Sequence, residues 1–244
     1  MERKIINRIR IKIPSHKITS ESLRLGILLE FVGGFLDAYT YICRGGVFAN
    51  AESGNIVLFS IGLASKNYKI ATTAIIQILF YALGTLVTEM IKDKHGKDDL
   101  SKQCKIILIV ESFILIMIGF MPTTVPNRVV TASIAFIASI QTSSFRKLVD
   151  SPYATTMCTA NLRTAMESLY SIVKNKDKKL INKFSRYMTI IIFFAIGGAL
   201  GGIISIKFGV KSIWVASLIL IIAYLMFYFD EYRYKKISQR DIIL

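Results

Sequence analysis

Apolar residues along this chain occur in long blocks rather than in the alternating or one-sided patterns of soluble domains. A helix needs about 20 mostly apolar residues to cross the hydrocarbon core of a bilayer. Six blocks reach or approach that length: 23–43, 70–91, 105–121, 128–146, 187–206 and 211–229. The pattern predicts an all-α membrane protein with six transmembrane helices.

Two shorter apolar segments, 54–65 and 156–173, each follow a stretch marked by glycine or proline. They either cross the membrane or are re-entrant, entering it and returning on the same side. Cytoplasmic loops carry an excess of Lys and Arg. If the short segments re-enter, both termini are cytoplasmic and the five lysines of 92–105 lie on that same side. If both cross, that loop lies outside. The charge distribution therefore favours six crossings and two short re-entrant helices.

The chain is expected to form one membrane domain, 23–229, between a basic cytoplasmic N-terminal segment, 1–22, and a basic cytoplasmic tail, 230–244. Within the domain, 46–55 can be placed over 152–161 without a gap, so that Ser53-Gly54-Asn55 falls on Thr159-Ala160-Asn161. Repeat one would cover about 23–121 and repeat two about 128–229. Three crossings in each half would make the two repeats inverted, and four would make them parallel. Chance similarity between small-residue-rich segments is the alternative.

The first apolar block carries two acidic residues. Gly26, Glu30, Gly33, Asp37 and Tyr41 recur every three or four positions and share one helix face. Carboxylates within a membrane span are costly and usually face the bundle interior or a water-filled cavity. Asp37 and Glu30 are therefore candidates for binding a proton or sodium ion. The alternative is a structural role, such as a pair between Asp37 and Arg44.

Small polar residues gather at the start of both short helices. Ser, Thr and Asn cap helix N-termini, and a capped N-terminus followed by a tiny residue can also hold a polar or anionic ligand. Capping alone is the simpler interpretation. The solute-binding candidates are Asn50, Ser53, Gly54, Asn55, Gln141, Thr155, Thr156, Thr159 and Asn161.

The formal net charge is +15. Because Lys and Arg lie between the apolar blocks, we expect anionic lipid head groups as their partners, and no nucleic acid. Sequence motifs for ATP binding, serine hydrolysis, zinc proteolysis and dinucleotide binding are absent. The histidines lie in polar segments and the three cysteines have no metal-binding spacing. We therefore expect no enzyme activity, no metal and no cofactor.

Several motifs resemble the YoaK family of bacterial multi-pass membrane proteins, catalogued as a domain of unknown function. They are 34–38 (GFLDA), 46–50 (GVFAN) and 53–55 (SGN), with Gln141 and 155–159 (TTMCT) in the second half. The resemblance covers about 25–225. Glu52 stands where the family usually has an uncharged residue, and Ala160 replaces a glycine. The resemblance implies a location in the bacterial inner or plasma membrane and supplies no established substrate.

These observations predict a secondary transporter of a small solute with a buried acidic coupling site. The alternative is a non-transporting membrane scaffold or sensor that binds a lipid or a protein partner. The sequence leaves open the identity of the solute and the formation of a homo-oligomer.

Overall fold

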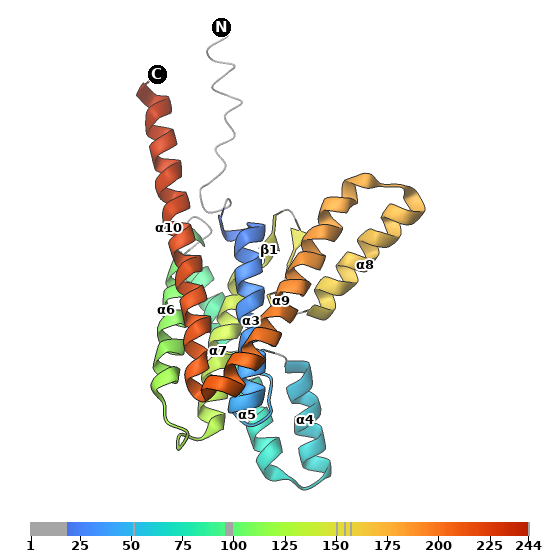
Figure 1. Ribbon diagram of the computed structural model, residues 1–244, viewed down its shortest axis with the longest axis vertical. Helices are drawn as coiled ribbons and strands as arrows, with labels where there is room; N and C mark the ends of the chain where they lie inside the picture. The colour runs from blue at the N-terminus through green and yellow to red at the C-terminus, as the bar shows by residue number, and fades with distance from the viewer. Residues whose placement is uncertain are drawn as a thin grey trace.

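A computed structural model describes residues 19–50, 52–95, 100–149, 151–153, 155–156 and 158–243. Most of the predicted N-terminal segment 1–22 lies outside the described residues. The described chain is dominated by helices, which confirms the all-α class (Figure 1). The helices are α3 (Leu23–Cys43), α4 (Glu52–Ala64), α5 (Tyr68–His95), α6 (Leu100–Phe120), α7 (Asn127–Ser144), α8 (Cys158–Asn175), α9 (Ile181–Phe208) and α10 (Ile213–Ile243).

Short elements complete the connections. An antiparallel pair, β1 (Lys147–Leu148) and β2 (Ser151–Pro152), follows α7. The 3₁₀ turns η2 (Lys178–Leu180) and η3 (Gly209–Ser212) lie before α9 and α10.

Among the described residues, four stretches are long and apolar enough to cross a membrane: Leu23–Cys43, Tyr68–Asp93, Lys102–Phe120 and Lys178–Asp230. The last of them contains α9 and the first part of α10, up to Asp230. Helix α7 is not among them, and it carries polar residues such as Gln141. The membrane class of the fold is thus supported, and the number of six crossings stays a prediction.

The long helices pack in pairs: α3 against α9, α5 against α7, and α6 against α10. Glycines allow the first two pairs to approach with backbones nearly touching, as is typical of small residues between membrane helices. A Cβ atom on Gly34 of α3 would overlap the carbonyl oxygen of Phe194 on α9, and one on Gly197 would overlap that of Phe31. A Cβ atom on Gly84 of α5 would overlap the carbonyl oxygen of Phe136 and the hydroxyl of Ser139, both on α7.

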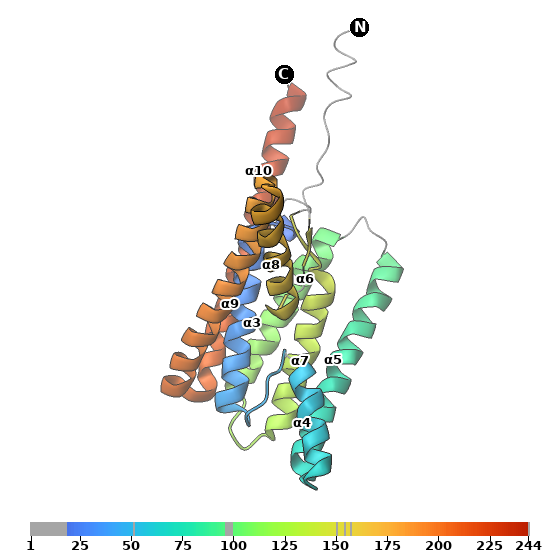
Figure 2. The ribbon, with the colours of Figure 1, turned by 90° about the vertical axis from the view of Figure 1, so that its right-hand side faces the viewer.

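The two short helices, α4 and α8, begin near the middle of the molecule's long axis and run from there in opposite directions (Figures 1 and 2). The segment after α3 turns back along that helix, because Asn50 bonds the carbonyl oxygen of Gly33. The segment before α8 lies between α3 and α7: the hydroxyl of Tyr153 donates to the carbonyl oxygen of Gly26, and Thr155 bonds Thr142. Each short helix then packs mainly on the long helix that follows it, α4 on α5 and α8 on α9.

The start of α3 and the distal part of α10 lie at the same end of the molecule. Thr19 donates a hydrogen bond of 3.0 Å to the carboxylate of Asp230, and Arg24 pairs with it at 3.4 Å. At the opposite end, Trp214 donates to the carbonyl oxygen of Ile116. The principal apolar core lies between these ends and is built from α3, α6, α7 and α10.

Candidate functional site

Asp37 lies on α3 with 8% of its surface exposed and faces the chain segment that precedes α4. Its Oδ1 accepts the backbone N–H of Asn50 at 3.0 Å, and the side-chain amide of Asn50 donates to the carbonyl oxygen of Gly33 at 3.0 Å. The carboxylate therefore fixes the segment that leads into α4. The alternative pair between Asp37 and Arg44 is not among the ion pairs that the described residues form. Arg44 Nε instead donates to the Tyr39 hydroxyl at 2.9 Å.

A second acid, Glu52, begins α4 beside Asp37. The side-chain amide of Asn55 donates to Glu52 Oε2 at 3.2 Å and to the carbonyl oxygen of Phe48 at 3.0 Å, and lies 3.4 Å from Gln77 Oε1. The sequence had marked Glu52 only as a departure from the family pattern. An acidic residue opening a short apolar helix was the signal that could have identified it.

A third acid, Glu30, lies fully buried on α3 beside the N-terminal end of α8. Its Oε1 accepts a hydrogen bond from the side-chain amide of Asn161 at 3.3 Å. The Tyr153 hydroxyl and the backbone N–H of Thr156 also approach this carboxylate. Tyr153 was not among the predicted site residues. The structure thus assigns one α3 carboxylate to the start of each short helix: Asp37 to α4 and Glu30 to α8.

Thr156 joins the two parts of the site. Its side chain covers Gly33, between Glu30 and Asp37, in the space that a Cβ atom on Gly33 would occupy. Its backbone is left-handed, with φ of 67°. This is an unfavourable conformation for a β-branched residue, and such strain concentrates at functional sites. Its hydroxyl is buried without a hydrogen-bond partner.

Thr155 lies next to it and donates from Oγ1 to Oγ1 of Thr142 at 3.0 Å. Tyr81 of α5 lies close to both Thr142 and Glu52, and so connects this pair with the acids.

Four predicted residues lie elsewhere. Ser53 and Thr159 are exposed, and Gly54 is half-exposed, so they lie outside the buried network. Gln141 belongs to a separate pair at the interface of α6 and α7. With its amide NH₂ turned toward Glu111, it donates to both carboxylate oxygens, at 2.7 and 2.8 Å.

The network leaves several buried polar atoms without hydrogen-bond partners. They are Glu30 Oε2, Asn50 Oδ1, Glu52 Oε1, Asn55 Oδ1, Gln77 Nε2 and Thr156 Oγ1. Buried polar groups are normally satisfied, so unsatisfied ones require an explanation. Most of these atoms are acceptors, which suit a cation, a proton or a ligand with N–H or O–H groups.

The charges agree with this chemistry. None of the ion pairs formed by the described residues involves Glu30, Asp37 or Glu52. The partial positive charge at the N-termini of α4 and α8 offsets only part of the carboxylate charge. Within the described part of the chain, no group of three His, Cys, Asp or Glu side chains is arranged to hold a metal ion. The unpaired carboxylates and free acceptor atoms suit a proton, a cation or a hydrogen-bonding solute.

Arg44 is a further buried charge that the sequence did not single out as a site residue. It is fully buried, and its Nη1 and Nη2 have no hydrogen-bond partner. Its guanidinium carbon lies 5.9 Å from the centre of the Tyr39 ring. Since Arg44 lies just beyond the C-terminal end of α3, it is displaced along the helix from Asp37 and Glu30.

Comparison with known proteins places this site within a family. The family described as "Protein of unknown function (DUF1275)" matches residues 25–226, a range that includes all the residues of the site. The UPF0700 transmembrane protein YoaK of Bacillus subtilis (strain 168) is 22% identical, and the match covers 77% of this chain and 86% of that protein. No solved structure matches. The chain therefore belongs to the DUF1275 family, which confirms the predicted relationship to YoaK.

Proposed function

We propose that this protein is a secondary transporter of a small solute, built from two inverted repeats, and not an enzyme. The observation that carries the proposal is that the starts of two short helices lie beside buried carboxylates on one helix, α3, where several polar atoms lack hydrogen-bond partners. Broken helices whose ends bind ions and solutes near mid-membrane are a recurring feature of secondary transporters.

The helix contacts support an inverted repeat. If α3 to α6 correspond to α7 to α10, the contact between α3 and α9 corresponds to that between α7 and α5. Likewise, the contact of α4 with α5 corresponds to that of α8 with α9, and α6 pairs with its own counterpart, α10. A two-fold exchange of the halves therefore reproduces the main helix contacts.

Individual residues follow the same exchange. Asp37 bonds Asn50 and Thr142 bonds Thr155, in each case thirteen positions apart. Lys66 and Lys176, just beyond α4 and α8, both have left-handed backbones, with φ of 56° and 55°. These pairs place Asn50 opposite Thr155, one position away from the gapless alignment of the sequence.

The repeat predicts that Lys66 and Lys176 lie on opposite sides of the membrane, since α4 and α8 run in opposite directions from mid-depth. Lys66→Cys and Lys176→Cys would each be made in a chain whose three native cysteines are replaced by alanine. We expect an impermeant maleimide added outside intact cells to label position 66 only. Position 176 should react after the membrane is opened. Labelling of both from the same side would contradict the inverted arrangement.

Transport at this site would couple the solute to a proton or a sodium ion. Glu30 and Asp37 are buried, so a change of conformation is needed to open the site to each side in turn. The two halves would rock about the interfaces of α3 with α9 and of α5 with α7, so that the site opens first to one side of the membrane and then to the other. The proposal includes a bacterial cell membrane location with both termini in the cytoplasm.

The decisive experiment is uptake into proteoliposomes. Purified protein would be tested with a panel of radiolabelled small solutes under an imposed proton gradient, then under a sodium gradient. We expect accumulation of at least one solute above protein-free vesicles, and its loss when an ionophore dissipates the gradient. A protein that remains folded and moves no solute under either gradient would contradict the proposal.

The second candidate is a non-transporting scaffold or sensor. The bond between Asp37 and the backbone of Asn50 favours it, because this contact also has a purely structural purpose.

A further inference from the structure

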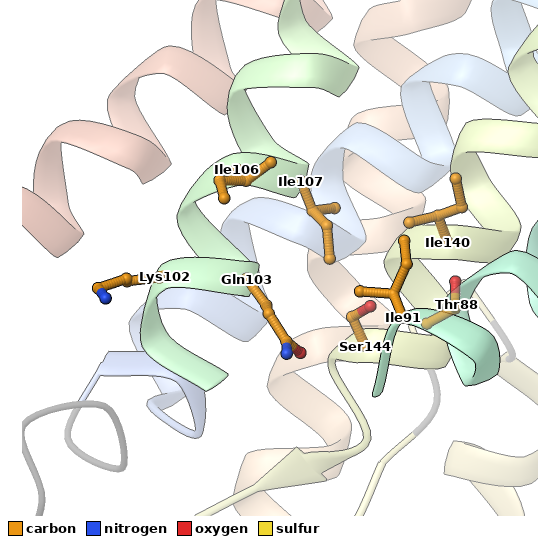
Figure 3. A pocket seen from close by; sticks show the side chains of 8 residues that line it. All are labelled: Thr88, Ile91, Lys102, Gln103, Ile106, Ile107, Ile140 and Ser144. Atoms are coloured by element: carbon orange, nitrogen blue, oxygen red, sulfur yellow. The ribbon is translucent and has the colours of Figure 1, made fainter. Parts of the chain in front are cut away.

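A pocket of about 230 Å³ lies between α5, α6 and α7, away from the acidic site (Figure 3). It lies at the end of the molecule that also holds the start of α3, because Lys147, just after α7, pairs with Glu21 at 4.0 Å. None of the residues lining it belongs to the acidic network. The side chains that matter most are Ile91, Ile106, Ile107, Ile140, Gln103 and Lys102.

The lining indicates a hydrocarbon occupant. Four isoleucines supply most of the wall, and apolar cavities hold water poorly. The hydroxyl of Thr88, another lining residue, is already bonded to the carbonyl oxygen of Gly84. The volume is below the roughly 300–1,000 Å³ of most sites for whole small molecules. Part of a larger molecule, such as the first segment of an acyl chain, fits better.

The mouth of the pocket lies beside the membrane. Ile91 and Ile106 are 42% and 58% exposed, although both belong to stretches apolar enough to cross a bilayer. Lipid rather than water would surround such side chains. An acyl chain could therefore enter sideways from the bilayer.

Two polar groups at the pocket indicate which end of a lipid lies there. Gln103 Nε2 is buried and has no hydrogen-bond partner. Figure 3 shows its amide lying toward Ser144 and Ile91, whereas the ammonium group of Lys102 extends away from the pocket. An amide N–H suits the ester carbonyl that joins an acyl chain to glycerol, and an exposed ammonium suits a phosphate.

The charge nearby favours an anionic head group. Lys92 lies close to Cys104, the residue that follows Gln103. Lys92 and Arg146 both pair with Glu89, at 2.9 and 2.5 Å. Across 89–105 together with Arg146, the sequence carries six Lys and Arg residues against four Asp and Glu residues. This excess of positive charge attracts anionic lipids.

We propose that this pocket binds one anionic phospholipid of the surrounding leaflet. Its acyl chain lies among the four isoleucines, its ester carbonyl accepts from Gln103, and its phosphate lies beside Lys102. This site is independent of the proposed transport site and does not require that the protein transports anything.

The test compares two matched substitutions on α6. Ile106→Trp fills the pocket, whereas Ile109→Trp adds the same side chain at a neighbouring position, 46% exposed, that does not line it. Purified protein in a neutral detergent would be titrated with phosphatidylglycerol or with phosphatidylcholine of the same chain length. Bound lipid would be counted by native mass spectrometry, and thermal melting would be followed in parallel.

We expect wild type and Ile109→Trp to retain one phosphatidylglycerol and to melt at a higher temperature with it, and Ile106→Trp to lose both effects. Gln103→Leu should bind roughly fivefold more weakly, because one net hydrogen bond contributes about 1 kcal/mol. Equal retention by the two tryptophan variants would overturn the pocket as the site. Equal binding of phosphatidylcholine, or binding of a free fatty acid but no phospholipid, would overturn the anionic phospholipid.

Discussion

Asp37→Asn is expected to reduce gradient-driven uptake of the transported solute to the level of protein-free vesicles while the protein stays folded. The asparagine keeps an oxygen that can accept the backbone N–H of Asn50, so the segment leading into α4 stays in place. It can neither carry a negative charge nor release a proton in the physiological range. Uptake under the imposed gradient and melting in detergent would be measured on the same preparation.

Two companion variants make this result interpretable. Glu167→Gln is the matched control, because Glu167 is an exposed carboxylate on α8 that pairs locally with Arg163. It should leave uptake unchanged. Asp37→Leu should lose uptake and also about 1–3 kcal/mol of stability, since the Asn50 N–H is left without an acceptor. Full uptake by Asp37→Asn would exclude Asp37 as the coupling site. A loss of stability in Asp37→Asn as large as that in Asp37→Leu would favour the scaffold.

Gly34→Ala is expected to destabilise the protein strongly, although it adds only one methyl group. The added Cβ atom would overlap the carbonyl oxygen of Phe194 and lie 2.9 Å from the backbone nitrogen of Gly198. Backbone atoms within a helix cannot turn away as a side chain can, so α3 and α9 must separate. Overpacking of this kind costs about 3 kcal/mol or more. The melting temperature should fall by roughly 6–12 °C, at about 2–4 °C for each kcal/mol.

Gly198→Ala is the matched control in the same interface. Its Cβ atom would lie 3.7 Å from the carbonyl oxygen of Gly34, which is an ordinary contact. Alanine also favours helix more than glycine does, by about 1 kcal/mol. We expect the melting temperature to stay the same or to rise. If both variants melt alike, the close approach of α3 and α9 is incorrect.

The sequence by itself determined the membrane class. The length of each apolar block is visible along the chain, and it must match the thickness of the hydrocarbon core. It also placed Glu30, Gly33 and Asp37 on one helix face, since helical periodicity depends only on spacing. The family followed from local motifs such as 34–38 and 46–50. The sequence could not predict that Gly34 packs against α9, because the residues around a glycine do not identify the helix that will approach it.

Only the tertiary structure decided which polar residues meet. Asn50, Asn55, Thr156 and Asn161 join the carboxylates, whereas Ser53 and Thr159 turn outward.

The direction of a side chain at a helix start depends on how the preceding segment folds back, which is set by contacts distant in sequence. Glu30 and Asn161 are 131 positions apart and still form a hydrogen bond. Residue type and spacing identified Asp37 as a candidate. Its place in a shared buried site depends on contacts of α3 with the segments before α4 and α8, which come together near Gly33.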